Sequence, residues 1–197
     1  MTPRLVLLDS GGANLGSVQA AFARLGVDAP VSSTAATIRA ATHVILPGVG
    51  AAAAAMSRLR ENGLDKLIPT LTQPLLGICV GMQLLFESSD EGDTECLGLL
   101  PGRVAHLRAQ PGVRVPHMGW NQLQTTRTHP LTEGLDAAWV YFVHSYAAPT
   151  AAATVADCTH GAAFSAVVAA DRVMGAQFHP ERSSGAGARL LRNFLAL

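Results

Sequence analysis

The sequence has little charge and no excess of either sign. Of its 197 residues 14% are charged, and 14 basic and 14 acidic side chains give a formal net charge of zero. Nucleic-acid-binding proteins usually carry a basic face, so we expect no nucleic-acid partner. Hydrophobic residues make up 49% of the chain, which excludes a disordered protein. The length favours a single domain over residues 1–197.

Cysteines and long apolar runs are also scarce. Cys79, Cys96 and Cys158 match no zinc-ligand spacing, and an odd number of cysteines makes a poor disulfide framework. No apolar stretch reaches the length of a membrane span. The apolar run at residues 5–8 is too short for the core of a signal peptide and is stopped by Asp9. We therefore expect a cytoplasmic protein that makes no membrane contact and holds no metal or cofactor.

Strand-like and helix-like segments alternate over the first 88 residues. Strands are expected at residues 5–8, 27–31 and 43–46 and again from Pro74, with helices at residues 14–25, 51–60 and 64–71. A Gly-rich turn at Gly11-Gly12 separates the first strand from the first helix. This alternation predicts a three-layer α/β fold, with a mostly parallel central sheet and helices on both faces.

The pattern changes after Ser88. A polar loop at residues 91–94 is followed by short β-like segments separated by Gly, Pro and Asn, which predict a partly antiparallel extension on the same domain. The candidate strands are residues 104–107, 122–124, 138–143, 154–156 and 166–168. A last strand at residues 173–178 and a closing helix at residues 186–195 complete the fold.

One stretch, Pro74 to Phe86, joins an apolar strand to an apolar helical pattern with Cys79 at the turn. Gly77 and Gly81 flank the cysteine at two residues on each side, as in the strand–elbow–helix of Gly-x-Ser-x-Gly hydrolases. Such a turn aims backbone N–H groups and a helix N-terminus at the sulfur, which favours a thiolate and a developing oxyanion. The alternative is a buried structural cysteine, which is how we interpret Cys96 and Cys158.

A loose dinucleotide-binding pattern occurs at residues 48–53, Gly-Val-Gly-Ala-Ala-Ala. It follows the third strand, and no acidic residue ends a strand about twenty positions later, so nucleotide binding is disfavoured. Pro47-Gly48-Val49-Gly50 is better explained as a turn whose N–H groups face a reacting centre, or as an ordinary strand-to-helix turn.

A histidine and a carboxylate end the last predicted strand in Phe178-His179-Pro180-Glu181. Pro180 keeps the chain extended, so both side chains can reach one region. A nucleophilic cysteine needs a histidine to move protons, and a carboxylate to orient the imidazole. Because Cys79 and His179 both follow parallel strands, we expect them at one edge of the sheet. Capping or surface roles for His179 and Glu181 are the alternative.

These motifs resemble the class I glutamine amidotransferases. Gly77-Ile78-Cys79-Val80-Gly81-Met82-Gln83 and His179-Pro180-Glu181 carry that resemblance. Pro116-His117-Met118-Gly119-Trp120-Asn121 and Phe142-Val143-His144-Ser145-Tyr146 are similar to the glutaminase subunits of imidazole glycerol phosphate synthase. The resemblance covers nearly the whole chain.

The resemblance implies a role for each matching residue. Cys79 is the nucleophile, His179 the acid and base, and Glu181 the orienting carboxylate, with backbone amides of Val49 and Val80 as the oxyanion hole. The residues implied to bind L-glutamine are Gly50, Gln83, His144, Ser145 and Tyr146, and those implied to face a (β/α)8-barrel cyclase partner are Asn14, Trp120, Asn121 and Arg182. The implied activity is hydrolysis of glutamine to glutamate and ammonia, which the cyclase uses in histidine biosynthesis.

Two positions depart from the family pattern. The segment at residues 9–15 reads Asp-Ser-Gly-Gly-Ala-Asn-Leu where Asp-Tyr-Gly is usual, and Ala51 follows Gly50 where an aromatic soon follows in many members. Two other functions are considered: a glutaminase for a different synthase, and a non-catalytic thiol redox or binding module. His43, His106, His129 and His160 receive no functional assignment.

Overall fold

The computed structural model describes residues 3–10 and 14–197, and the Gly11-Gly12 turn expected from the sequence lies outside them. Five parallel strands form the centre of the main sheet, in the spatial order β2, β1, β3, β4 and β14. Their bounds are Val31–Ser32, Leu5–Leu8, His43–Gly48, Leu75–Cys79 and Val173–Ala176. Strands β1, β3, β4 and β14 are buried along their whole length, as expected for a parallel sheet covered on both faces.

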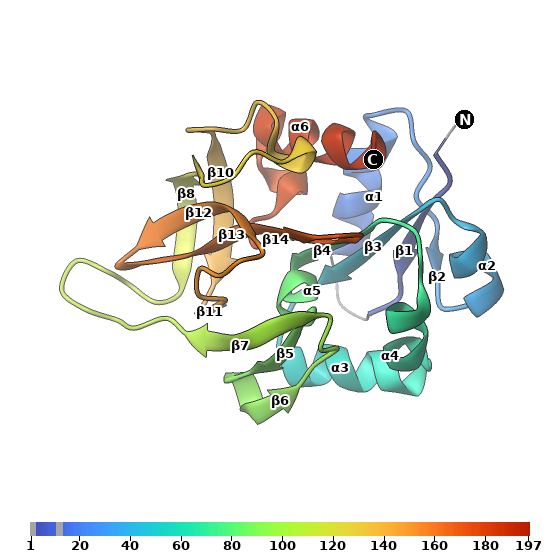
Figure 1. Ribbon diagram of the computed structural model, residues 1–197, viewed down its shortest axis with the longest axis horizontal. Helices are drawn as coiled ribbons and strands as arrows, with labels where there is room; N and C mark the ends of the chain where they lie inside the picture. Colours follow the sequence, from blue (N-terminus) through green and yellow to red (C-terminus); the bar gives the residue numbers. More distant parts are fainter. Residues whose placement is uncertain (1–2, 11–13) are drawn as a thin grey trace.

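Helices lie on both sides of this sheet (Figure 1). Helices α1 (Leu15–Ala23) and α6 (Ser184–Leu195) lie on one side, and α3 (Ala52–Glu61), α4 (Leu64–Leu67) and α5 (Val80–Gln83) lie on the other. The buried face of α6 contains Leu190, Leu191 and Phe194, at the helical spacing that the sequence predicts. The three-layer α/β prediction is confirmed.

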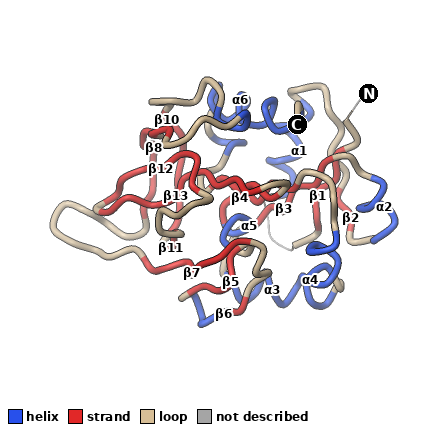
Figure 2. Tube along the Cα trace, viewed as in Figure 1, coloured by secondary structure: helices blue, strands red, loops and turns tan. Residues whose placement is uncertain are grey.

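Antiparallel strands extend the main sheet beyond β14. Strands β13 (Ala162–Ala170), β12 (Thr154–His160) and β9 (Gln124–Thr125) pair in that order, so the predicted antiparallel extension is present. A ribbon of β8 (His117–Gln122) and β10 (Trp139–His144) lies beside it, and β11 (Tyr146–Ala147), β7 (Leu100–His106), β5 (Phe86–Ser89) and β6 (Thr94–Glu95) form a further sheet. Figure 2 shows strand and loop in this region, with helices gathered around the parallel strands.

Proline explains two differences from the predicted elements. The strand expected at residues 27–31 forms only over Val31–Ser32, because Pro30 precedes it at the edge of the sheet and cannot donate to a ladder. The helix expected at residues 64–71 is α4 followed by a 3-10 turn over Ile68–Thr70, since Pro69 removes one backbone donor.

Other elements were missed or placed differently. Helix α2 (Ala35–Ala40) was not predicted; it is short and has one buried residue, Ile38. The helical pattern after Cys79 stops at Gln83, and Phe86 already begins β5, because this apolar segment pairs with β7 instead of continuing as a helix. Tertiary pairing therefore overrides local helical periodicity here. No helix in residues 3–10 and 14–197 combines the length and apolar character needed to cross a membrane.

Candidate active site

Cys79 sits on a strained turn between β4 and α5. Its φ of 53° and ψ of −112° lie in a region that side-chain-bearing residues rarely adopt. The turn is crowded at both flanking glycines: a Cβ on Gly81 would overlap the carbonyl oxygen of Leu46, and one on Gly77 would lie 2.6 Å from the carbonyl oxygen of Gly81. The flanking glycines therefore allow the elbow to pack against β3 (His43–Gly48).

His179 and Glu181 form a buried pair beside the elbow. Nδ1 of His179 lies 2.7 Å from Oε1 of Glu181, and the two side chains are 5% and 1% exposed. Asn14 donates from Nδ2 to the same carboxylate oxygen. The main chain is also fixed, because His179 donates its N–H to the carbonyl of Tyr141 and Ser183 Oγ donates to the carbonyl of His179. The imidazole therefore has one orientation and one carboxylate partner.

The pKa values of His179 and Glu181 are set by contacts whose effects outweigh the effect of burial. Burial lowers the pKa of His179, but hydrogen bonds to Cys79 and Glu181 and their charges raise it to about 10. Burial raises the pKa of Glu181, but the hydrogen bond and charge of His179, with the hydrogen bond from Asn14, lower it overall. At neutral pH the site therefore holds an imidazolium between a carboxylate and the Cys79 sulfur. A cation beside a cysteine favours its thiolate form.

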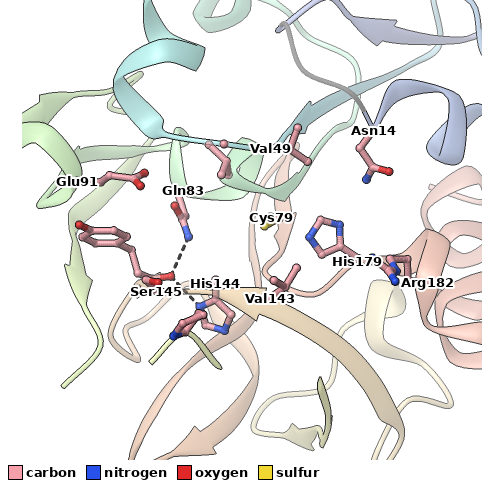
Figure 3. A pocket seen from close by; sticks show the side chains of 14 residues that line it. Asn14, Val49, Cys79, Gln83, Glu91, Val143, His144, Ser145, His179 and Arg182 are labelled. Atoms are coloured by element: carbon pink, nitrogen blue, oxygen red, sulfur yellow. Dashed lines mark hydrogen bonds between the residues drawn. The ribbon is translucent and has the colours of Figure 1, made fainter. Parts of the chain in front are cut away.

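A cavity of about 390 Å³ opens over the sulfur and gathers most of the residues singled out from the sequence (Figure 3). Its lining includes Asn14, Val49, Gly50, Cys79, Val80, Gln83, His144, Ser145, Tyr146, His179 and Arg182. Glu181 lies behind His179, while Trp120 and Asn121 are on β8 and do not line the cavity. The cavity thus places a cysteine sulfur, a histidine and a set of polar groups around one space.

Comparisons with known proteins agree with this geometry. The model of the family "Glutamine amidotransferase class-I" matches residues 6–197. The HisH subunits of imidazole glycerol phosphate synthase from Xanthomonas euvesicatoria and Xanthomonas axonopodis are 60% and 59% identical, over 98% of this chain and 97% of each relative. The chain belongs to the class-I glutamine amidotransferase family. Within that family it falls with the HisH subunits.

A solved structure supports the same architecture. The crystal structure of a glutamine amidotransferase superposes with a TM-score of 0.76 at 21% identity, covering 98% of this chain and 97% of that one. At that identity the likeness shows the fold alone. The amidotransferase fold is therefore supported independently of the high sequence identity to HisH subunits.

Glu91 also lines the amidotransferase cavity, although no sequence motif pointed to it. Its side chain lies on the far side of Gln83 from His179 (Figure 3). Oε2 of Glu91 accepts a hydrogen bond of 2.7 Å from the backbone N–H of Ala52 at the start of α3. The loop at residues 91–94 was interpreted only as polar, and no local signal distinguishes an acid that faces a cavity from one that faces solvent.

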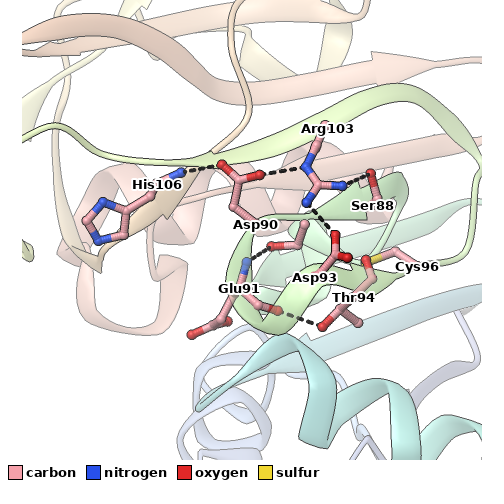
Figure 4. Close-up of polar contacts among 9 residues, drawn as sticks. Ser88, Asp90, Glu91, Asp93, Thr94, Cys96, Arg103 and His106 are labelled. Atoms are coloured by element: carbon pink, nitrogen blue, oxygen red, sulfur yellow. Dashed lines mark hydrogen bonds and ion pairs between the residues drawn. The ribbon is translucent and has the colours of Figure 1, made fainter.

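Ion pairs hold the turn that carries Glu91 (Figure 4). Arg103 on β7 contacts Asp90 at 2.5 Å and Asp93 at 2.7 Å, on either side of Glu91. The hydrogen bond from Arg103 lowers the pKa of the exposed Asp90 carboxyl. Within the turn, Thr94 Oγ1 donates to the carbonyl of Glu91. These contacts fix the backbone on both sides of Glu91 and so position its carboxylate at the cavity.

Gln177 and His160 were also missed. Gln177 is fully buried, and its Nε2 lies 3.8 Å from Sγ of Cys79. His160, to which we assigned no function, stacks on His117 with 4.0 Å between ring centroids. Neither residue belongs to a pattern that sequence spacing could detect, because the partners come from distant strands. His160 on β12 meets His117 on β8, and Gln177 directly follows β14, which pairs with β4 and so lies beside Cys79.

The other two cysteines differ from Cys79. Burial raises the pKa of Cys96 to about 11 and that of Cys158 to about 12, so both are thiols at neutral pH. Neither lines the amidotransferase cavity. Their structural interpretation is consistent with these surroundings.

Proposed function

We propose that this amidotransferase cleaves the side-chain amide of L-glutamine with Cys79 as the nucleophile. The observation that carries the proposal is the strained elbow, which presents the sulfur at a cavity beside the His179–Glu181 pair. Attack by the thiolate forms a carbon–sulfur bond, and the carbonyl oxygen becomes an oxyanion. His179 then gives its proton to the amide nitrogen, the carbon–nitrogen bond breaks, and ammonia leaves.

Water completes the turnover. The neutral imidazole left after the first step takes a proton from water, whose oxygen attacks the thioester, and glutamate leaves with regeneration of the sulfur. The Val80 N–H lies at the start of α5 and Val49 lies on the facing turn, so these backbone amides are the proposed oxyanion donors. Each such donor contributes a factor of about 10² or more to the rate.

The polar end of the cavity fits the amino-acid part of glutamine. Glu91 offers a carboxylate for the substrate's ammonium group, and Gln83 offers its side-chain oxygen, since both N–H groups of that amide already have acceptors. Gly50, Ser145 and Tyr146 complete the proposed contacts with the substrate, and His144 supports Tyr146 through its carbonyl. Glu91 is thus added to the residues expected from the sequence.

Ammonia passes, in this proposal, to a (β/α)8-barrel cyclase subunit that makes imidazole glycerol phosphate in histidine biosynthesis. The names of the HisH relatives support a partner subunit. On the β8 ribbon Trp120 is 49% and Met118 64% exposed, which makes that face suitable for docking. The guanidinium carbon of Arg182 lies 4.6 Å from the ring centroid of Tyr141 on β10, so Arg182 lies at the same ribbon. Residues 1–197 then act as one cytoplasmic glutaminase domain.

Asn14 has a second role in this proposal. The resemblance implied contact with the partner, whereas its Nδ2 donates to Glu181 inside the site. We therefore assign Asn14 to positioning of the carboxylate as well as to the partner face. Asn121 likewise makes internal hydrogen bonds, to the carbonyl of Thr159 and to His117.

The decisive experiment separates glutamine cleavage from synthesis. Cys79→Ala should abolish glutamine-dependent formation of imidazole glycerol phosphate by the complex, while synthesis supplied with ammonium salt continues. Cys158→Ala is the matched control and should retain glutamine-dependent synthesis. Labelling by a glutamine-like electrophile should map to Cys79. Labelling of Cys96 or Cys158 instead, or loss of ammonium-dependent synthesis in Cys79→Ala, would contradict the assignment.

A further inference from the structure

Tyr146 offers one backbone carbonyl to two buried side chains. His144 Nδ1 and Gln83 Nε2 each lie 2.8 Å from this oxygen. A carbonyl oxygen can only accept hydrogen bonds, so both nitrogens carry the proton at this point. This single acceptor therefore fixes the tautomer of His144 and the amide orientation of Gln83.

This tautomer also fixes the proton direction, meaning which partner donates in each hydrogen bond, outward through the histidines. Because neutral His144 carries its proton on Nδ1, its Nε2 must accept, and Nδ1 of His117 at 3.1 Å must donate. Nε2 of His117 then has a free lone pair, and Asn121 Nδ2 lies 3.3 Å from it. The Asn121 amide is oriented independently, since its Nδ2 also donates to the Thr159 carbonyl and its Oδ1 accepts from the Gln122 N–H.

Burial keeps both histidines neutral, which this arrangement requires. His117 and His144 are 4% and 6% exposed. Burial, together with the nearby histidines, lowers the pKa of His117 to about 3 and that of His144 to about 4. His160 stacks on His117 from β12, and His179 faces His144 across the cavity. The two rings therefore present one donor and one acceptor each at neutral pH.

The proton direction also propagates inward to the nucleophile. The second N–H of Gln83 lies toward Oε1 of Gln177 at 3.0 Å, which leaves the Nε2 of Gln177 directed at Cys79 Sγ, 3.8 Å away. Gln83 and Gln177 are 2% and 0% exposed, so water does not compete for these groups. An N–H donor directed at sulfur stabilises the thiolate relative to the thiol.

We propose that the Tyr146 carbonyl sets the proton direction of a hydrogen-bond chain from Asn121 to Gln177, and that this chain holds an N–H donor against the reacting sulfur. Gln177 contacts the sulfur itself. Gln83, His144, His117 and Asn121 are positioning residues that act through it. The proposal rests on the role of Cys79 as nucleophile and adds a thiolate-stabilising group to His179.

Two measurements on the whole chain test the inference. Long-range ¹H–¹⁵N spectra of the imidazoles at pH 7 should show His117 and His144 neutral and protonated at Nδ1. In Asn121→Asp the new carboxylate demands a proton on Nε2 of His117, so His117 should change tautomer or become doubly protonated. Gln122→Glu, the same amide-to-acid change on the adjacent exposed position of β8, should leave both rings unchanged. An Nε2-protonated His144 in the unmodified protein would overturn the proposal.

The second measurement follows the sulfur. In Gln177→Met, which removes the donor at similar size, the rate of Cys79 alkylation by iodoacetamide at pH 7 should fall about threefold or more. The pH dependence of this alkylation rate should shift to higher pH by a matching amount. The other charged groups around the sulfur, His179, Glu181, Glu91 and Arg182, are unchanged in this variant, so the shift reports the loss of the Gln177 donor. An unchanged rate and profile in a folded Gln177→Met protein would refute the role of Gln177. These readouts need no glutamine turnover, so they fail separately from the proposed glutaminase activity.

Discussion

Cys79 illustrates how backbone strain positions a reactive atom. A non-glycine residue in its conformation costs on the order of 1–3 kcal/mol, which the surrounding structure must hold in place. Strand β4 and its neighbours supply that support, because β4 pairs on both sides, with β3 and β14, and is completely buried. The Cys79 sulfur is therefore rigidly placed at the cavity.

Glu181→Gln tests the carboxylate of the proposed catalytic triad Cys79, His179 and Glu181. Oε1 of Glu181 accepts from both His179 and Asn14, so the position requires an acceptor, and a neutral amide no longer stabilises the imidazolium. The glutaminase kcat of the complex should fall about 10²- to 10⁴-fold. Synthesis supplied with ammonium salt should be preserved.

Glu133→Gln, the same change at an exposed position, is the control for that experiment and should keep the original kcat. An unchanged kcat in Glu133→Gln would show that the loss in Glu181→Gln comes from removing the charge beside His179, and not from a glutamate-to-glutamine change as such. A Glu181→Gln enzyme with undiminished kcat would remove the carboxylate from the proposed mechanism.

Helix α6 positions the end of the site that carries His179 and Glu181. It packs closely on the turn Pro180–Arg182, where a Cβ on Gly187 would overlap the carbonyl group of Pro180. Ser183 adds a second attachment, since its Oγ donates to the His179 carbonyl and accepts from the Tyr141 N–H. The position of the turn at Pro180–Arg182 is thus set by how closely helix α6 can approach it.

Gly187→Ala should therefore weaken both stability and activity. Moving the Pro180 backbone to admit the methyl group costs about 1–3 kcal/mol in the free energy of unfolding, and the displaced His179 should lower kcat. Gly185→Ala is the matched control on the same helix, because its Cβ would enter open space. That variant should gain about 0.4–1 kcal/mol. Equal urea midpoints for the two variants would show that the contact is unimportant.

Across the whole molecule, buried histidines link the fold to pH. His117 and His144 are held neutral with pKa values lowered to about 3 and about 4, while in the unfolded chain they titrate near 6.5. Below pH 6.5 the unfolded state therefore binds more protons than the folded state, so the free energy of unfolding decreases as the pH is lowered. The raised pKa of His179 works in the opposite direction: its contribution is complete below pH 6.5 and is lost as pH rises through about 10.

Urea unfolding at pH 7.5, 6.5 and 5 should reveal this dependence. Each buried neutral histidine should reduce the free energy of unfolding by about 2 kcal/mol between pH 6.5 and 5. The lowered pKa of Glu181 adds a further loss at lower pH, as that carboxylate becomes protonated. His144→Gln should flatten the dependence between pH 6.5 and 5, even if it lowers stability at every pH. An equally steep profile in His144→Gln would contradict this account.

The sequence by itself determined the parallel core and several residues that meet at the candidate site. Apolar periodicity located β1, β3, β4 and α6, because fully buried strands and a one-sided helix leave strong local patterns. The paired glycines around Cys79 and the His179-Pro180-Glu181 turn could also be recognised in the sequence. Backbone crowding and proton transfer each require particular residue types at fixed spacing. The meeting of the His179 and Glu181 side chains was expected from that spacing, whereas their burial was not.

Tertiary structure alone decided the groups that meet from distant strands. Glu91 became part of the cavity because Arg103 holds its turn, and Gln177 reached the sulfur because β14 pairs with β4. The protonation pattern of His117 and His144 depends on the Tyr146 carbonyl, which no side-chain pattern reveals. Hydrogen-bond direction is a property of which donor faces which acceptor, and only the folded chain brings those partners together.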